Sequence, residues 1–216
     1  MTVRQSSLGF VGASFFGWGL LRALIDILVA ARQLRQPAHD LEVMLVPFSF
    51  FVAYLLVPIP ASRFIRKFGL RIGLPAATGI MGLAALWYSI FGQTSSQMAS
   101  FACLFAIAVG IVALQTSGNP SVMLLGSSAT GARRLLGAQS ILALGSALAP
   151  FYVGLVDVRL APDPAIMLAR ARMVYIGSGV LMVSLALVLL VRREVGLDGE
   201  KARVGASKIP VPLRTR

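Results

Sequence analysis

The chain has 216 residues, of which 57% are apolar and only 13% are charged, whereas soluble domains carry about a quarter charged residues. Together with a mean hydropathy of +0.82, this composition exceeds what a soluble core can bury, which excludes a soluble enzyme. The net charge of +12 does not indicate a nucleic-acid-binding protein, because the sequence lacks a basic face interleaved with aromatic residues and any recognisable binding module.

Apolar runs along the chain are long enough to cross the hydrocarbon core of a bilayer, which takes about 20 residues of helix. Backbone polar groups find no water in lipid, so each run is predicted to be an α-helix. The predicted spans are residues 8–31, 41–62, 70–92, 98–125, 135–156 and 173–191. The predicted fold is an all-α membrane protein, with a six-helix transmembrane domain over residues 1–191 and a disordered basic tail over residues 192–216.

The distribution of lysine and arginine predicts how these spans are oriented. The basic residues are concentrated before the first span, between the second and third, between the fourth and fifth, and in the tail. If successive spans alternate in direction, these segments all lie on one side of the membrane. Both termini are therefore predicted to be cytoplasmic, with the lipid bilayer as the surrounding partner.

A pair of opposite charges lies inside the first predicted span. Asp26 follows Arg22 by about one helical turn, so the two side chains share a face and can form a salt bridge. Ionisable groups inside a membrane are energetically costly and often mark ion or substrate pathways. Asp26 is interpreted either as a proton-carrying or substrate-binding carboxylate in a wet cavity, or as a structural partner of Arg22.

Polar residues also gather in the fourth predicted span, just before a proline that is expected to break or tilt the helix. They are Gln115, Thr116, Ser117 and Asn119, followed by Pro120. Such groups either line a substrate path or join helices by hydrogen bonds, and their spacing alone does not separate these two interpretations. The same alternatives apply, with less force, to Gln139 in the fifth span.

The sequence contains no recognisable catalytic or metal-binding constellation. Its single cysteine, Cys103, lies in the apolar fourth span, where a small buried hydrophobic residue is expected. Its single histidine, His39, is expected to be solvated in an outer loop. One cysteine and one histidine make neither a zinc site nor a thiol–histidine catalytic pair, so no enzyme activity, metal or cofactor is expected.

Several segments, taken in order, resemble one transporter family. The most specific block consists of residues 114–126 (LQTSGNPSVMLLG), 134–139 (RLLGAQ) and 144–150 (LGSALAP), and residues 16–28 and 54–73 agree with it. The family is that of the fucose and glucose/galactose permeases, which are proton-linked sugar symporters of the major facilitator superfamily. The resemblance extends over about residues 8–195 and implies transport by membrane helices.

The resemblance also implies roles for individual residues. Asp26 matches a first-span carboxylate that couples protons to sugar, and Gln115 falls where the glucose/galactose branch has glutamine and the fucose branch has a second carboxylate. The implied substrate is therefore a hexose. The implied substrate and proton pathway comprises Asp26, Gln115, Asn119, Gln139 and Arg22. The loop that helps to hold the gates is matched by Arg66, Lys67 and Arg71.

The chain departs from the family pattern at several polar positions. Amides of the family are replaced by Arg22, Ile25, Pro47 and Leu142. Each replacement removes a group that would bind a sugar hydroxyl, so substrate recognition is expected to be weaker or different. Arg22 adds a cation, which leaves an anionic substrate as an alternative.

Permeases of this superfamily have two six-helix halves with the substrate held between them near the midplane, and this chain resembles the N-terminal half. A lone half would leave its inner face, with Asp26, Gln115 and Gln139, without a partner, and exposing these groups to lipid would be costly. We therefore expect the chain to pair with a second six-helix half or with a second copy of itself. The alternative is a truncated or decayed permease product that acts as a non-transporting membrane protein. The family context implies a bacterial inner membrane.

Overall fold

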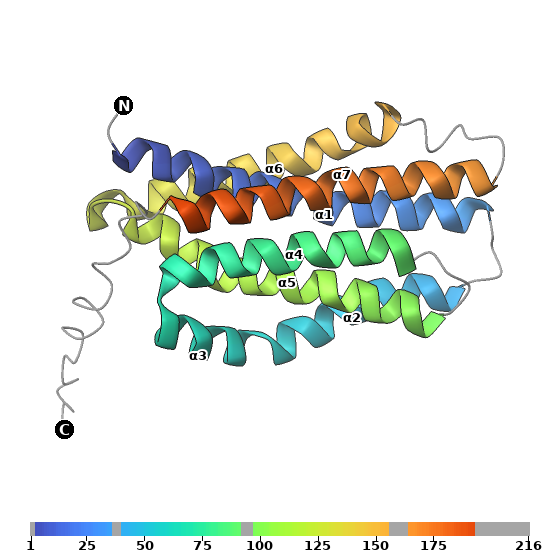
Figure 1. Ribbon diagram of the computed structural model, residues 1–216, viewed down its shortest axis with the longest axis horizontal. Helices are drawn as coiled ribbons and strands as arrows, with labels where there is room; N and C mark the ends of the chain where they lie inside the picture. The colour runs from blue at the N-terminus through green and yellow to red at the C-terminus, as the bar shows by residue number, and fades with distance from the viewer. Residues whose placement is uncertain (1–2, 36–39, 92–96, 156–163, 193–216) are drawn as a thin grey trace, which may run out of the picture.

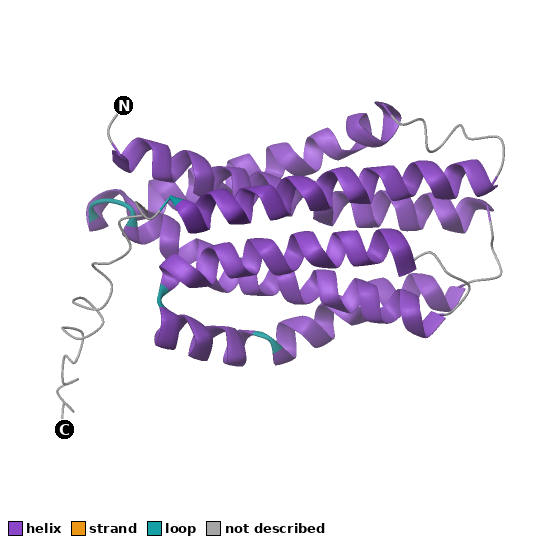
Figure 2. Ribbon diagram, in the orientation of Figure 1, coloured by secondary structure: helices purple, strands orange, loops and turns teal. Residues whose placement is uncertain are grey.

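The computed structural model describes residues 3–35, 40–91, 97–155 and 164–192, and this part of the chain is an all-helical bundle (Figure 1, Figure 2). The elements are α1 (Val3–Arg35), α2 (Asp40–Leu56), α3 (Pro58–Phe68), α4 (Leu70–Phe91), α5 (Gln97–Leu124), the short 3₁₀ helix η1 (Ser128–Thr130), α6 (Gly131–Leu155) and α7 (Pro164–Val191). The predictions for His39 and for the tail beyond Arg192 lie outside the described residues.

Within the described residues, five helices are long and apolar enough to cross a membrane, namely α1, α4, α5, α6 and α7. The second predicted span corresponds to a bent pair in which the end of α2 and α3 meet at 47° around Val57. The bend has a local cause, because Pro58 has no backbone N–H to bond the carbonyl oxygen of Tyr54 one turn earlier, and its ring crowds that carbonyl. Val57 itself keeps a helical conformation, with φ −77° and ψ −35°. Counting the pair as one span gives six, so the predicted all-α membrane fold is confirmed.

The helices pack so that the connections predicted to share one side of the membrane lie together. Helix α4 contacts α5 and α7, α1 contacts α6, and α2 contacts α5. The start of α1, the α3–α4 connection, η1 and the end of α7 all lie at one end of the bundle, on the left of Figure 1. This end, called the basic end below, is the one that the sequence predicts to face the cytoplasm.

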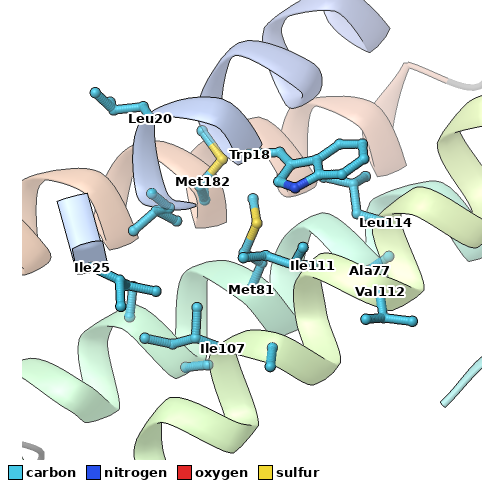
Figure 3. Close-up of a cluster of buried hydrophobic side chains, with 14 of the residues drawn as sticks. Trp18, Leu20, Ile25, Ala77, Met81, Ile107, Ile111, Val112, Leu114 and Met182 are labelled. Atoms are coloured by element: carbon cyan, nitrogen blue, oxygen red, sulfur yellow. The ribbon is translucent and has the colours of Figure 1, made fainter. Parts of the chain in front are cut away.

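Side chains from four helices meet in the core. Trp18 of α1, Met81 of α4, Ile111 of α5 and Met182 of α7 are buried and converge on one another (Figure 3). The outer surface is also apolar, since side chains such as Phe51 at 74% remain exposed. An apolar surface of this extent is not stable in water, and it fits contact with lipid tails.

Close backbone approach holds α1 against α6. A side chain at Gly19 would overlap the carbonyl oxygen of Leu142, and a side chain at Gly145 would overlap the carbonyl oxygen of Phe16. The Ser146 hydroxyl donates a hydrogen bond to the Gly19 carbonyl oxygen over 3.0 Å. Helices in lipid gain no hydrophobic driving force from pairing with one another, so small residues that allow such close packing stabilise the bundle.

An arginine holds the connection between α5 and α6 at the basic end. The Arg134 guanidinium donates to the carbonyl oxygens of Val122 (3.0 Å), Met123 (2.6 Å) and Ser127 (3.0 Å), and to the Thr130 hydroxyl (2.6 Å). The carbonyls at the end of a helix lack intrahelical donors and carry the negative end of the helix dipole. Arg134 therefore supplies hydrogen-bond donors to the free carbonyl oxygens in the last turn of α5, and its positive charge interacts favourably with the negative end of the helix dipole.

Replacing Arg134 with glutamine is expected to lower the free energy of unfolding by about 2 kcal/mol, because hydrogen bonds to a charged group contribute about 1.5–3 kcal/mol. The measurement is thermal or denaturant unfolding in mild detergent. Arg133→Gln is the matched control, since Arg133 is an exposed neighbour on the same turn. Equal loss of stability in the two variants would contradict the assigned role.

Candidate functional site

The charged pair of the first span is formed in the structure. Arg22 Nε lies 3.5 Å from Asp26 Oδ2, one turn further along α1. The Arg22 guanidinium carbon also lies 4.4 Å from the centre of the Phe50 ring of α2, within the range of a cation–π contact. Arg22 is therefore held from two sides, by a carboxylate on its own helix and by an aromatic face on the next.

This pair lies at the surface of the bundle and is not enclosed by it. The side chains of Arg22 and Asp26 are 44% and 56% exposed, respectively. At the centre of a membrane helix, an arginine or aspartate facing lipid costs about 2.5–3.5 kcal/mol on insertion scales. Neutralisation of one charge by the other reduces this cost, but both groups keep polar surface that lipid does not satisfy.

An amide pair joins α5 to α6. Gln139 Nε2 donates a hydrogen bond to Asn119 Oδ1 over 3.3 Å, and both side chains are half-buried. The helix does not break at Pro120 but continues for another turn to Leu124. The structure thus brings together two of the predicted pathway residues that lie on different helices.

The polar cluster predicted in the fourth span divides into two kinds of residue. Thr116 donates to the Val112 carbonyl oxygen over 2.8 Å, and Ser117 donates to the Ala113 carbonyl oxygen over 2.9 Å. These hydroxyls are satisfied by their own helix, as serine and threonine often are in helices. They are therefore not needed for any contact outside α5.

Gln115 differs from the other residues of that cluster because its side-chain oxygen lacks a hydrogen bond. Its Oε1 atom is buried and has no hydrogen-bond partner among the described residues. An unsatisfied buried acceptor costs about 1–3 kcal/mol. Most buried side-chain polar atoms have a hydrogen-bond partner, which sets Gln115 apart from its neighbours Thr116 and Ser117.

The candidate residues are staggered along the bundle. Gly118 of α5 packs against the Phe15 ring of α1, which sets the depth of the neighbouring Asn119. Asp26 lies eleven residues after Phe15, or about 16 Å along the helix at 1.5 Å per residue. Within the described residues, no hydrogen bond or ion pair joins the Arg22–Asp26 pair to the Asn119–Gln139 pair, so the structure does not bring these two groups together.

The three predicted gating residues flank the α3–α4 connection at the basic end. Arg66 and Lys67 lie in the last turn of α3 and are exposed, whereas Arg71 lies in the first turn of α4 and is half-buried. Gly69 between the two helices has a φ of 81°, a backbone conformation that favours glycine. This sharp connection fixes where the three basic residues stand.

Two side-chain contacts were not identified from the sequence, one at the Arg22–Asp26 pair and one at the basic end of the bundle. Phe50 gave no signal, because one phenylalanine in an apolar span does not reveal that its ring lies under Arg22. Arg134 gave a partial signal, since a basic residue soon after the end of a helix is typical of a side chain that caps its carbonyls. Such contacts depend on packing between helices, which periodicity does not encode.

Comparison with known proteins gives sequence and structural relatives, although no protein-family model matches the chain. It is 30% identical over 174 residues to a glucose/galactose transporter of Brucella abortus, covering 76% of this chain and 41% of that protein. It is 28% identical over 138 residues to an L-fucose-proton symporter of Escherichia coli, covering 64% of this chain and 32% of the symporter.

A solved structure has the same fold. A crystal structure of a major facilitator superfamily transporter, FucP, in the outward conformation aligns with a TM-score of 0.74 and 22% identity, over 88% of this chain and 50% of FucP. The chain therefore spans half or less of the length of these relatives.

Proposed function

Because this chain has the fold of half a major facilitator superfamily transporter and is related in sequence to sugar transporters, we propose that it moves a hexose across a membrane as one six-helix half of a secondary transporter. The observation that carries the proposal is the open Arg22–Asp26 pair on α1. A charged pair with half its surface uncovered is costly in lipid. It is instead suited to the wall of a wet cavity between two halves.

Asp26 is the proposed proton carrier. As a carboxylate it pairs with Arg22 over 3.5 Å, and on taking a proton it loses its charge and releases that pairing. Arg22 then keeps its contact with the Phe50 ring. A salt bridge that forms and breaks with one proton provides two states of α1, as a coupled transporter requires.

The amides of α5 and α6 are the proposed hexose contacts. The Gln115 oxygen is buried and has no partner within the described residues. In this proposal it becomes accessible when the helices rearrange during transport, and it then accepts a hydrogen bond from a sugar hydroxyl. The Asn119–Gln139 pair lies one turn further along α5 and offers further amide donors and acceptors. Arg66, Lys67 and Arg71, at the α3–α4 connection, are the proposed gate-holding residues.

The proposal is tested by reconstitution into liposomes. The chain is incorporated at high density, alone and together with any second six-helix unit encoded downstream, and uptake of labelled D-glucose and D-galactose is measured. We expect saturable uptake that L-glucose does not inhibit. Absence of saturable flux under both conditions would contradict transport and favour a non-transporting membrane protein.

Replacing Gln115 with leucine is expected to move stability and transport in opposite directions. The free energy of unfolding rises by about 1 kcal/mol because an unsatisfied buried oxygen is removed. The apparent hexose affinity falls by about tenfold, as for the loss of one hydrogen bond. Detergent unfolding and uptake kinetics measure the two effects.

Thr116→Val is the matched control for this prediction, because the Thr116 hydroxyl is satisfied by its own helix. It is expected to leave hexose affinity unchanged. If Gln115→Leu lowers stability and leaves affinity unaltered, Gln115 is a packing residue and not a sugar contact.

A further inference from the structure

A cavity of about 310 Å³ lies between α3, α4 and α5, a volume at the lower end of the range of ligand pockets. Its walls are apolar and include Ala61 and Phe64 of α3, Ala76 and Ile80 of α4, and Val109 and Ala113 of α5. The bend at Val57 directs α3 away from the end of α2, and Figure 1 shows α3 standing off from α4 and α5 at the basic end of the bundle.

The chemistry of the walls restricts what can fill this cavity. A sugar would find no side-chain donors or acceptors there, and a buried water needs two to four polar partners. The cavity is also separate from the polar residues of the proposed transport pathway, none of which lines it. An apolar occupant fits these walls.

Helix α3 places basic side chains beside this apolar space. Its cavity side carries Ala61, Phe64 and Ile65, whereas Arg63 and Lys67 are exposed. These two residues are four apart and so share one stripe of the helix. An amphipathic helix with basic residues on its polar face is typical of contact with anionic lipid headgroups.

Aromatic side chains connect the basic stripe to the cavity wall. The Lys67 ammonium lies 5.2 Å from the centre of the Phe68 ring, and the Phe68 and Phe64 ring centres are 4.6 Å apart. Phe64 lines the cavity. A single amphiphile can therefore contact the basic residues with its polar end and the cavity with its apolar end.

We propose that this cavity is a phospholipid site, which takes one acyl chain of an anionic phospholipid while Arg63 and Lys67 bind its phosphate headgroup. The positive charge excludes a preference for zwitterionic lipid, and the apolar walls exclude a free phosphate as the occupant. The site shares Lys67 with the proposed gate-holding residues, but lipid retention requires neither a hexose nor transport activity, so the two proposals can fail separately.

The test is native mass spectrometry of the full chain released from nanodiscs that contain equal amounts of dioleoyl phosphatidylglycerol and dioleoyl phosphatidylcholine. We expect the chain to retain phosphatidylglycerol preferentially. One basic residue near an anionic headgroup gives about a fivefold preference, so Arg63→Gln/Lys67→Gln should lower the retention ratio by about 25-fold.

Two control variants distinguish binding of the lipid headgroup from binding of its acyl chain. Arg133→Gln/Arg192→Gln removes two exposed positive charges at the same end, one in α6 and one directly after α7, and is expected to leave the ratio unchanged. Ala61→Phe fills the cavity and is expected to reduce retention of both lipids, with helix content checked by circular dichroism.

Several results would overturn the proposal. They are equal retention of the two lipids by the parent chain, or an equal fall in the ratio for both double variants. A third is that no lipid is retained and Ala61→Phe changes the mass of the protein complex, which would identify the cavity as a contact with another protein chain. The two double variants alter only exposed side chains, so the test does not depend on the folding of Ala61→Phe.

Discussion

Uptake of hexose against a concentration gradient is expected to be lost when Asp26 is replaced by asparagine. Asparagine keeps the shape of the side chain but cannot bind and release a proton, so an imposed pH gradient no longer drives accumulation. The expected result is uptake at the level of empty liposomes when the gradient is the only driving force. The measurement is accumulation of labelled galactose in liposomes after an inward proton gradient is imposed.

A second variant distinguishes coupling from damage to the fold. Asp26→Asn leaves the Arg22 charge without its carboxylate, and an uncompensated arginine costs about 2.5–3.5 kcal/mol at the centre of a membrane helix. Arg22→Gln/Asp26→Asn removes both charges and should insert normally while still failing to accumulate hexose. Accumulation at the parent level by either variant would show that Asp26 does not carry the proton.

The largest structural effect is expected for Gly145→Leu. Any side chain at Gly145 overlaps the Phe16 carbonyl of α1, and this contact is with backbone that cannot rotate away. We expect a loss of about 3 kcal/mol in the free energy of unfolding, at the upper end of the range for overpacked interiors. The measurement is detergent unfolding followed by circular dichroism.

Gly137→Leu provides the matched control on the same helix. A side chain at Gly137 meets no atom within 4 Å, and leucine has a higher helix propensity than glycine. This variant is expected to be neutral or slightly stabilising. Similar destabilisation by both variants would show that the close contact between α1 and α6 is not what stabilises the bundle.

Features that depend on local sequence were predicted from it. The apolar runs indicated membrane helices, and the spacing of Arg22 and Asp26 indicated a salt bridge that is present at 3.5 Å. The bend at Val57 had a signal in Pro58 and Pro60, but the second span was predicted without a break. A proline within a span is compatible with a continuous helix, as Pro120 of α5 shows. The presence of a proline alone therefore does not predict whether a helix bends.

Features that depend on helix packing were not predictable in this way. The sequence placed Gln115, Asn119 and Gln139 together as polar pathway candidates without ranking them. The structure joins Asn119 to Gln139 and leaves the Gln115 oxygen without a partner among the described residues. This difference depends on which faces of α5 and α6 meet, and the local sequence does not determine that.

The central proposal is that the polar surface of α1, α5 and α6 forms one wall of a cavity that a second six-helix unit completes. The mass of the complex formed by the purified chain of 22.9 kDa tests this most directly, measured by native mass spectrometry after gentle release from the membrane. The account predicts a complex of two six-helix units, as two copies or as this chain with a second half. A strict monomer at every concentration, with or without a candidate second half, would contradict it.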